Sequence, residues 1–370
     1  MSDTWEKYYG FAKKVPITLS EQGRTIVLSD IHGNLPFLKG ILKKLSFSQE
    51  DTLIFLGDML EKGKYSLQTL RFIMELEKTH RVYTLCGNCD AYILLFFETD
   101  DFDSSFFQDF LRRPLTKHSM LRQMGREAGV KNLNDLPLLR KTIRKTHKDI
   151  WDYLKQLPTI FESEKYFFVH GGVDTMEDNP RLLAWDCMKN DHFHEQDHCF
   201  TKYMIVGHCP TTLYHEDFQN ASPIIDHERK IISIDGGCVL KLDGQLNALI
   251  LEDDKISYDN FDGLPLIRAL ESQNASENPL NIRWGHNKVK IISQEGEFSL
   301  CTHLETGKQI KILTKFLHHR KDSVCCEDAT DYLLPIQKGD IFSYSEEVSQ
   351  GVLGKKEGVT GWYLGKYEKI

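Results

Sequence analysis

Aspartate, histidine and asparagine side chains recur in five short glycine-containing segments of this chain. Each segment adjoins an apolar run typical of a buried β-strand. The five are residues 29–34 (SDIHGN), 57–63 (GDMLEKG), 87–90 (GNCD), 169–172 (VHGG) and 206–210 (VGHCP). Polar side chains placed at the carboxyl ends of strands meet at one edge of a sheet. The pattern therefore predicts one site assembled from five segments.

The candidate ligands are two carboxylates, three imidazoles and one amide, supplied by Asp30, Asp58, His32, His170, His208 and Asn88. This mixture suits divalent manganese, iron or zinc better than calcium, which prefers all-oxygen sites. Asp30 and His32 are two residues apart and can grip one ion, while Asp58 is suited to bridging two. Two ions roughly 3.5–4 Å apart lower the pKa of a bridging water and clamp phosphate oxygens. We therefore expect a phosphate-ester hydrolase that needs no serine or cysteine nucleophile.

The motif order D-x-H, G-D-x-x-x-x-G, G-N-x-[DE], H-G-G and G-H resembles the calcineurin-like metallophosphoesterase superfamily. With residues 234–238 (IDGGC), it is most similar to the phosphoprotein phosphatase branch, which includes serine/threonine phosphatases and symmetrical dinucleoside tetraphosphatases. The resemblance covers residues 24–255. It implies a four-layer α/β/β/α sandwich and attack by a hydroxide that bridges two metal ions. It also implies a first metal held by Asp30, His32 and Asp58, and a second held by Asp58, Asn88, His170 and His208.

Two motifs depart from the family pattern. Glu61 and Lys62 replace the usual Asp-Arg of the second motif, and Cys89 replaces the histidine of the third. Lys62 keeps the positive charge but loses the bidentate fork of arginine. We expect Lys62 and Asn88 to bind the substrate phosphate; the alternative is that Lys62 is a solvated loop residue.

Cys89 and its neighbour Asp90 are the candidate catalytic residues. A thiol with a pKa near 8.5 is a poor substitute for an imidazolium, and general acid catalysis is typically worth about 10²–10⁴-fold. Phosphoserine-like monoesters should suffer most from this change; aryl esters, diesters and anhydrides should suffer less. The alternative is that Cys89 only fills space.

The basic residue that the family often supplies after H-G-G has two candidates, Arg181 and Lys189. The acidic and histidine-rich stretch at residues 191–198 lacks a preceding strand, so it is expected to be a solvated polar loop.

Composition narrows the function further. A formal net charge of −8 argues against a general nucleic-acid binder, although it leaves a small nucleotide possible as substrate. The nine cysteines show no paired spacing, which predicts free thiols in a reducing cytoplasm. No signal peptide or membrane-length apolar run is expected.

The chain is expected to form a catalytic domain at residues 1–260, a linker at 261–283 and a small β-rich domain at 284–370. Strands and helices alternate in the first domain, which predicts a layered α/β core. Apolar residues at helical intervals predict a helical insert at residues 98–157. Residues 358–367 resemble the last strands of an SH3-like barrel, which could dock a substrate or partner.

The leading hypothesis is a dinuclear metallophosphoesterase similar to the serine/threonine protein phosphatases, acting on phosphorylated proteins or small nucleotides. The alternatives are a phosphodiesterase, a dinucleoside polyphosphate hydrolase, and a catalytically weak metal-binding scaffold.

Overall fold

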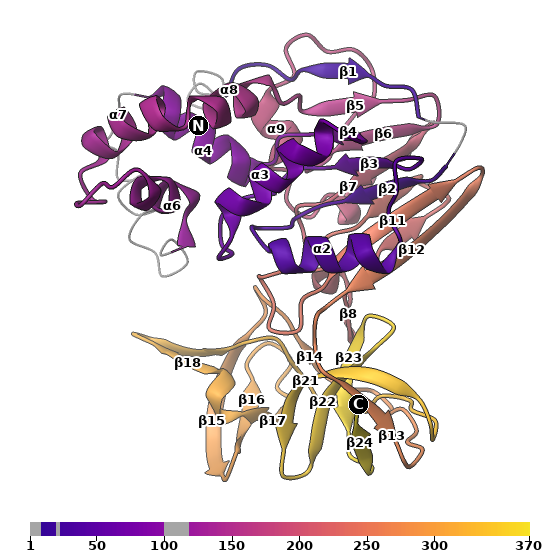
Figure 1. Cartoon of the computed structure of the whole chain (residues 1–370). Helices are drawn as coiled ribbons and strands as arrows, with labels where there is room; N and C mark the ends of the chain where they lie inside the picture. Colours follow the sequence, from indigo (N-terminus) through magenta and orange to yellow (C-terminus); the bar gives the residue numbers. More distant parts are fainter. Residues whose placement is uncertain (1–8, 20–22, 100–117) are drawn as a thin grey trace. The chain divides into compact units, whose positions relative to one another are not determined.

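The computed structural model describes residues 9–19, 23–99 and 118–370 and divides into two compact units (Figure 1). Unit 1 contains Met1–Pro210, Pro223–Leu240 and Gln245–Phe261. Unit 2 contains Thr211–Ser222, Lys241–Gly244 and Asp262–Ile370. Among the described helices, none combines the length and apolar composition that crossing a bilayer requires.

The first sheet of unit 1 has three parallel strands, β2, β3 and β4, extended by two antiparallel ones. In spatial order its strands are β12 (Lys255–Phe261), β11 (Leu246–Glu252), β2 (Thr25–Leu28), β3 (Thr52–Phe55) and β4 (Arg81–Thr84). Every residue of β2 and β3 is buried. These strands therefore lack a polar face, as expected for parallel strands covered on both sides.

The second sheet of unit 1 has six strands, of which β6, β7 and β10 are parallel neighbours. Their order is β1 (Lys14–Pro16), β5 (Ile160–Glu162), β6 (Tyr166–Val169), β7 (Tyr203–Val206), β10 (Ile231–Ser233) and β9 (Ile224–Asp226). One apolar cluster joins the two sheets, with Val27 and Ile54 from the first packed among Phe168, Ile205 and Ile232 from the second. Hydrophobic burial between the sheets thus fixes the position of both sets of strand ends.

Helices cover the outer face of the first sheet through a second cluster that includes Leu38, Ile41, Leu70 and Ile93. These residues belong to α2 (Leu35–Lys44), α3 (Ser66–Glu77) and α4 (Asn88–Glu98). Three more helices, α6 (Met120–Glu127), α7 (Leu136–Thr146) and α8 (Lys148–Gln156), pack against α3 and α4. On the other sheet, α9 (Ala184–Met188) and the 3₁₀ turn η2 (Phe193–Glu195) contribute Cys187 and Phe193 to a third cluster.

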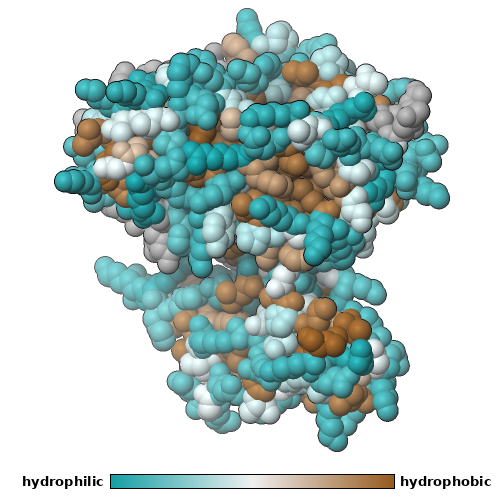
Figure 2. Space-filling view, in the orientation of Figure 1, coloured by the Kyte–Doolittle hydropathy of each residue, from teal (hydrophilic) through white to brown (hydrophobic). Residues whose placement is uncertain are grey.

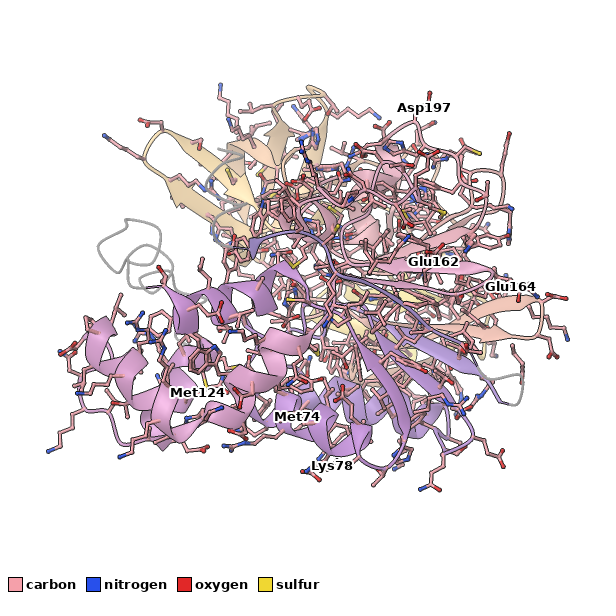
Figure 3. All side chains as sticks on the ribbon, turned by 90° about the horizontal axis from the view of Figure 1, so that it is seen from above. Met74, Lys78, Met124, Glu162, Glu164 and Asp197 are labelled. Atoms are coloured by element: carbon pink, nitrogen blue, oxygen red, sulfur yellow. The ribbon has the colours of Figure 1, made fainter. Side chains whose placement is uncertain are left out.

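Local sequence explains where helices of unit 1 begin. Asn34 precedes α2 and accepts a hydrogen bond from the Phe37 backbone N at 3.3 Å, and Asp135 caps α7 in the same way. Helices α6, α7 and α8 occupy the described part of the predicted insert, with Met124 of α6 at its centre (Figure 3). Residues 100–117 of that insert lie outside the described residues.

Unit 2 is almost entirely β-structure. Its six-stranded sheet has the order β24 (Tyr367–Lys369), β13 (Leu266–Ala269), β21 (Ile341–Val348), β22 (Gly351–Lys356), β23 (Val359–Tyr363) and β8 (Gln219–Asn220). A five-stranded sheet has the order β17 (Gln309–Leu313), β16 (Phe298–His303), β15 (Lys288–Glu295), β19 (Ser323–Cys326) and β18 (Leu317–Arg320). The strands β14 (Asn281–Ile282) and β20 (Ala329–Thr330) form a pair, and two 3₁₀ turns, η3 (Thr211–Tyr214) and η4 (Thr314–Phe316), complete the unit.

Two features of the carboxyl-terminal part concern the predicted linker and the predicted barrel. The segment 261–283, expected as a linker, contains β13 and β14, because these short strands find hydrogen-bonding partners far along the chain. The strand orders of the larger sheets of unit 2 are open at both ends, so the described residues show no closed barrel. A β-rich carboxyl-terminal unit is present; its SH3-like character stays a prediction.

Candidate metal centre

The five polar segments follow strands of both sheets in unit 1, as the sequence predicted. Asp30, Asp58 and Asn88 come after the parallel strands β2, β3 and β4, and His170 and His208 come after β6 and β7. Because the strands within each set are parallel, their carboxyl ends point the same way. The two sheets therefore deliver their polar side chains to one site.

Several ligand candidates have left-handed backbone conformations. Asp30, His32, Asp58 and His208 have φ angles of 54°, 49°, 50° and 70°. A non-glycine residue in this region costs on the order of 1–3 kcal/mol, and such strain is concentrated at functional sites. A backbone hydrogen bond from His32 N to Asp58 O, at 2.9 Å, ties the first two segments together in this conformation.

Glycine is required where these segments approach one another. A Cβ at Gly207 would lie 2.0 Å from Ser29 Oγ and 2.4 Å from Asp30 Oδ2. A Cβ at Gly87 would lie 2.3 Å from Asp58 Oδ1. The glycines in the motifs thus leave room for the carboxylates.

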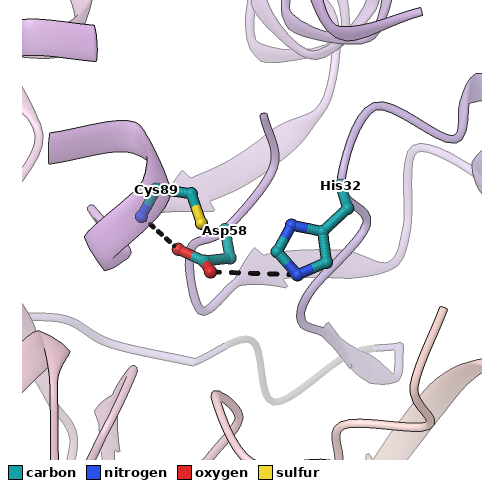
Figure 4. Close-up of side chains that lie close together, drawn as sticks. All are labelled: His32, Asp58 and Cys89. Carbon is teal, nitrogen blue, oxygen red and sulfur yellow. Dashed lines mark hydrogen bonds and ion pairs between the residues drawn. The ribbon is translucent and has the colours of Figure 1, made fainter. Parts of the chain in front are cut away.

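Asp58 lies between the two halves of the site. Its Oδ1 accepts a hydrogen bond from Cys89 N at 2.7 Å, and its Oδ2 lies 3.9 Å from His32 Nε2 (Figure 4). The same Oδ1 lies 3.4 Å from His170 Nε2. Burial favours the neutral acid, but the His170 and His32 imidazoles outweigh it and hold the pKa of Asp58 well below its usual value. Asp58 is therefore an anion with one oxygen toward each histidine, the arrangement that a bridging ligand requires.

Asp30 supplies a second buried carboxylate. Its Oδ2 accepts hydrogen bonds from Ser29 Oγ at 2.6 Å and from His208 N at 2.9 Å. Its Oδ1 lies 3.7 Å from His32 Nε2 and has no hydrogen-bond partner among the described residues. A buried carboxylate oxygen in this condition is costly unless a cation satisfies it, so this oxygen fits a metal ligand.

His170 lies beside Asp58 Oδ1, and Asn88 lies beside His170. Asn88 Oδ1 is 3.3 Å from His170 Nε2. Metal–ligand bonds of about 2.0–2.2 Å place neighbouring ligand atoms roughly 3–3.5 Å apart, so the donor spacing fits one ion. Asp30, Asp58 and His170 also form a compact potential ligand group, and His32, Asp58 and Cys89 form another. The donor set of the two groups fits divalent metal ions.

His208 is placed differently from the other predicted ligands. Its ring centroid lies 5.3 Å from that of His170, but its Nε2 is 2.7 Å from Asp191 Oδ1 and 3.2 Å from Lys189 Nζ. It forms a third potential ligand group with Asp191 and Cys209. Asp191 belongs to the stretch that was expected to be a solvated loop, and that expectation missed its contact with His208. No strand precedes Asp191, so sequence periodicity offered no signal for it.

Lys62 points into the site. Its Nζ lies 3.1 Å from His32 Nε2. Burial would lower the pKa of Lys62, but the nearby Cys89, Asp58 and Asp30 groups outweigh it and raise that pKa. Lys62 is therefore a cation within the site, in contrast to the solvated alternative. Of the two other basic candidates, Lys189 approaches His208, whereas Arg181 is exposed to solvent.

Cys89 and Asp90 are both buried at the start of α4. Burial and the neighbouring Asp58 raise the pKa of the Cys89 thiol well above its usual value, so this thiol is a poor proton donor. Asp90 accepts hydrogen bonds from Leu60 N at 3.2 Å and Gly87 N at 3.0 Å, and burial followed by the Asp58 charge raises its pKa to about 7. These contacts position the second and third motifs; a catalytic part for either residue stays a prediction.

Asp235 is a site residue to which sequence reasoning gave no role. It follows β10, is fully buried and accepts a hydrogen bond from Gly237 N at 2.8 Å. Burial and the Asp30 charge raise its pKa well above the usual value. The signal was available, since residues 234–238 follow an apolar run like the other segments.

The chain is similar in sequence to a known protein family and to curated proteins. The sequence profile of the calcineurin-like phosphoesterase family matches residues 23–232. The symmetrical bis(5'-nucleosyl)-tetraphosphatase of Vibrio cholerae serotype O1 (strain O395) is 29% identical over 153 residues, which are 41% of this chain and 45% of that protein. This chain thus spans less than half the length of that curated relative.

Solved structures resemble the chain more distantly. One provisionally assigned as a diadenosine tetraphosphatase is 20% identical with a TM-score of 0.45, covering 68% of this chain and 100% of its own. A serine/threonine phosphatase from Saccharomyces cerevisiae is 11% identical with a TM-score of 0.41, covering 71% and 86%. Because the family profile spans more than half of the sequence, this chain belongs to the calcineurin-like phosphoesterase family.

Proposed function

We propose that this chain is a metal-dependent phosphoesterase with two ion sites that share Asp58. The observation that carries the proposal is the position of Asp58, with one carboxylate oxygen toward His32 and the other toward His170. Asp30, His32 and Asp58 would hold the first ion, and Asp58, Asn88, His170 and His208 the second. When bound, two such ions lower the pKa of a water molecule and clamp phosphate oxygens. Manganese, iron and zinc all suit this donor set.

The remaining residues of the site would act on the substrate itself. Lys62 supplies a half-buried positive charge to bind the phosphate, assisted by the Asn88 amide. Lys189 supplies a second positive charge beside His208. Cys89 holds no readily donated proton, because burial raises the pKa of its thiol. A leaving group must therefore depart without an imidazolium to protonate it.

The lack of a proton donor at position 89 favours some substrate classes over others. Alkoxide leaving groups such as serine need a proton most, whereas nucleotide phosphates and aryl oxides leave readily. We accordingly favour a phosphoanhydride or phosphodiester, including a dinucleoside polyphosphate, over a phosphorylated protein. The name of the Vibrio relative supports the anhydride. A protein phosphatase-like activity and a catalytically weak scaffold are the remaining candidates, the second favoured by Cys89 alone.

The experiment compares 4-nitrophenyl phosphate, bis-4-nitrophenyl phosphate and diadenosine tetraphosphate as substrates of the protein loaded with manganese, with Asp58→Asn as control. Preference for the diester or the anhydride, abolished in the control, supports the proposal. Preference for the monoester restores the protein phosphatase. If bound manganese is demonstrated and all three substrates stay intact, the scaffold is the better explanation.

Unit 2 is proposed to dock a substrate or partner protein. Its visible face includes an apolar patch (Figure 2), and Trp284 in this unit is 65% exposed. Large exposed aromatic residues often anchor protein interfaces. Loss of substrate selectivity in Trp284→Ala, with unchanged turnover of 4-nitrophenyl phosphate, would support docking. We also propose that the domains divide near residues 260 and 283 and that the layers of unit 1 have the order α/β/β/α. A cytoplasmic location is proposed as well.

A further inference from the structure

Glu61 and Lys62 form a strained corner between the second motif and helix α3. Both residues have left-handed backbones, with φ angles of 69° and 65°. Neither is glycine, so the two conformations together cost on the order of 2–4 kcal/mol. Such a corner relaxes unless side-chain contacts hold it, and the two side chains reach in different directions.

The Glu61 side chain connects the corner to the helical insert. It is 3% exposed, and its Oε1 accepts hydrogen bonds from Met120 N at 2.7 Å and from Ser119 Oγ at 3.1 Å, where α6 begins. The backbone N of Glu61 donates to Ser66 Oγ at 3.0 Å, so this residue also joins the start of α3. The Glu61 carboxylate is thus turned away from Cys89. In the family pattern, a shorter aspartate at position 61 holds a histidine at position 89.

Two further contacts fasten α6 to α3. Gln123 Oε1 accepts a hydrogen bond from Leu67 N at 3.1 Å. Arg71 and Glu127 form a bidentate ion pair on the surface, at 2.9 and 2.5 Å. The ion pair is about half exposed and is worth little energetically. The buried Glu61 contacts are therefore the connection between the insert and the corner itself.

Lys62 points from the same corner into the metal centre, with Nζ 3.1 Å from His32 Nε2. The next residue, Gly63, leaves no room for the corner to shift toward the first motif, since a Cβ there would lie 2.0 Å from His32 O. The position of the Lys62 ammonium therefore depends on the backbone at residue 61.

We propose that Glu61 is a positioning residue that sets Lys62 for the substrate phosphate by fastening the corner to helix α6. The inference rests on the proposed function, in which Lys62 binds phosphate. It assigns the helical insert a part in substrate binding, because Ser119 and Met120 of the insert donate hydrogen bonds to Glu61. Replacement of the family's aspartate by glutamate then provides the added length needed to reach α6.

The test uses four variants of the full chain loaded with manganese. Glu61→Ala removes the contact, and Glu61→Asp leaves the acid one methylene too short to reach α6. Glu61→Gln keeps an acceptor oxygen at full length, and Arg71→Gln is the matched control that breaks only the surface contact between α3 and α6. The readouts are kcat and KM for bis-4-nitrophenyl phosphate, the inhibition constant of inorganic phosphate, and phosphate binding by calorimetry.

We expect Glu61→Ala and Glu61→Asp to raise KM and the phosphate inhibition constant about tenfold, with kcat changed less than about threefold, because binding of the phosphate is the main loss. Glu61→Gln and Arg71→Gln should stay within about twofold of the natural chain. If Glu61→Ala does not fold, Ser119→Ala replaces it, with a smaller increase in the same two constants expected.

Two results would overturn the inference. One is a folded Glu61→Ala with unchanged KM and phosphate affinity, which would leave Glu61 as a cap for α6 only. The other is a loss in Glu61→Gln as large as in Glu61→Ala, which would point to the charge. Failure of the proposed function looks different, since the natural chain would then neither hydrolyse these substrates nor bind phosphate.

Discussion

Replacing Cys89 tests whether this position determines the leaving group that the enzyme tolerates. The structure shows a buried thiol, 5% exposed, whose pKa burial and Asp58 raise well above the usual value. Such a group donates no proton near neutral pH. Cys89→Ala should therefore change kcat/KM by less than about threefold for aryl and alkyl phosphates alike, well short of the 10²–10⁴-fold expected of a general acid.

Cys89→His should restore part of the missing proton donor. General acid catalysis of 10²–10⁴-fold corresponds to about 3–5 kcal/mol of barrier. We expect less than this full effect, about 10–100-fold on a phosphoserine peptide, because the Glu61 carboxylate that could orient the new imidazole is bound to α6. The larger ring also enters a packed site, and such overpacking typically costs about 1–3 kcal/mol of stability.

The assay is the ratio of kcat/KM for a phosphoserine peptide to that for 4-nitrophenyl phosphate, with thermal melting to confirm folding. Cys86→Ala is the matched control, since Cys86 is a second buried thiol three residues before Cys89. The reasoning is refuted if Cys89→Ala lowers the ratio by 30-fold or more, since the thiol would then be the proton donor. A folded, metal-loaded Cys89→His with an unchanged ratio would refute it equally.

Three further predictions follow from the site. Asp58→Asn should lower kcat by about 10³-fold and reduce the manganese bound per chain, as measured by elemental analysis; an unchanged metal content would exclude Asp58 as a bridge. Gly207→Ala should destabilise the chain by more than about 2 kcal/mol, because its Cβ would meet Asp30 Oδ2 at 2.4 Å. Urea unfolding measures this, with Gly129→Ala for comparison: a Cβ there has open space, and only the left-handed φ of 74° opposes alanine, at about 1–2 kcal/mol; a loss at Gly207 no larger than at Gly129 would contradict the predicted clash. Burial raises the pKa of Glu61 to about 7 from 4.5, so the folded chain binds this proton more tightly than the unfolded one. The free energy of unfolding should therefore fall by up to about 3 kcal/mol between pH 4.5 and 7 and level off above, and Glu61→Gln should lose this component, whereas an identical pH profile would contradict the shift.

The sequence alone predicted the strands and the residues that follow them. Asp30, Asp58 and His170 each come directly after or close to a buried apolar run, and glycine beside them marks the tight turn that the site needs. These signals are local, because strand propensity and turn chemistry act over a few neighbouring residues. The metal-ligand chemistry could therefore be stated before any contact was known.

The tertiary structure decided the contacts between distant segments. The pairing of Asp191 with His208, the effect of the Asp30 charge on buried Asp235, and the strands at residues 266–269 and 281–282 all depend on partners far along the chain. The direction of the Glu61 side chain was likewise decided by tertiary packing. Its identity as an acid was evident from the sequence, but only the packing of α6 against the second motif determined that it binds the insert and not the residue at position 89. Periodicity carries no information about such contacts, because they arise from how the elements pack together.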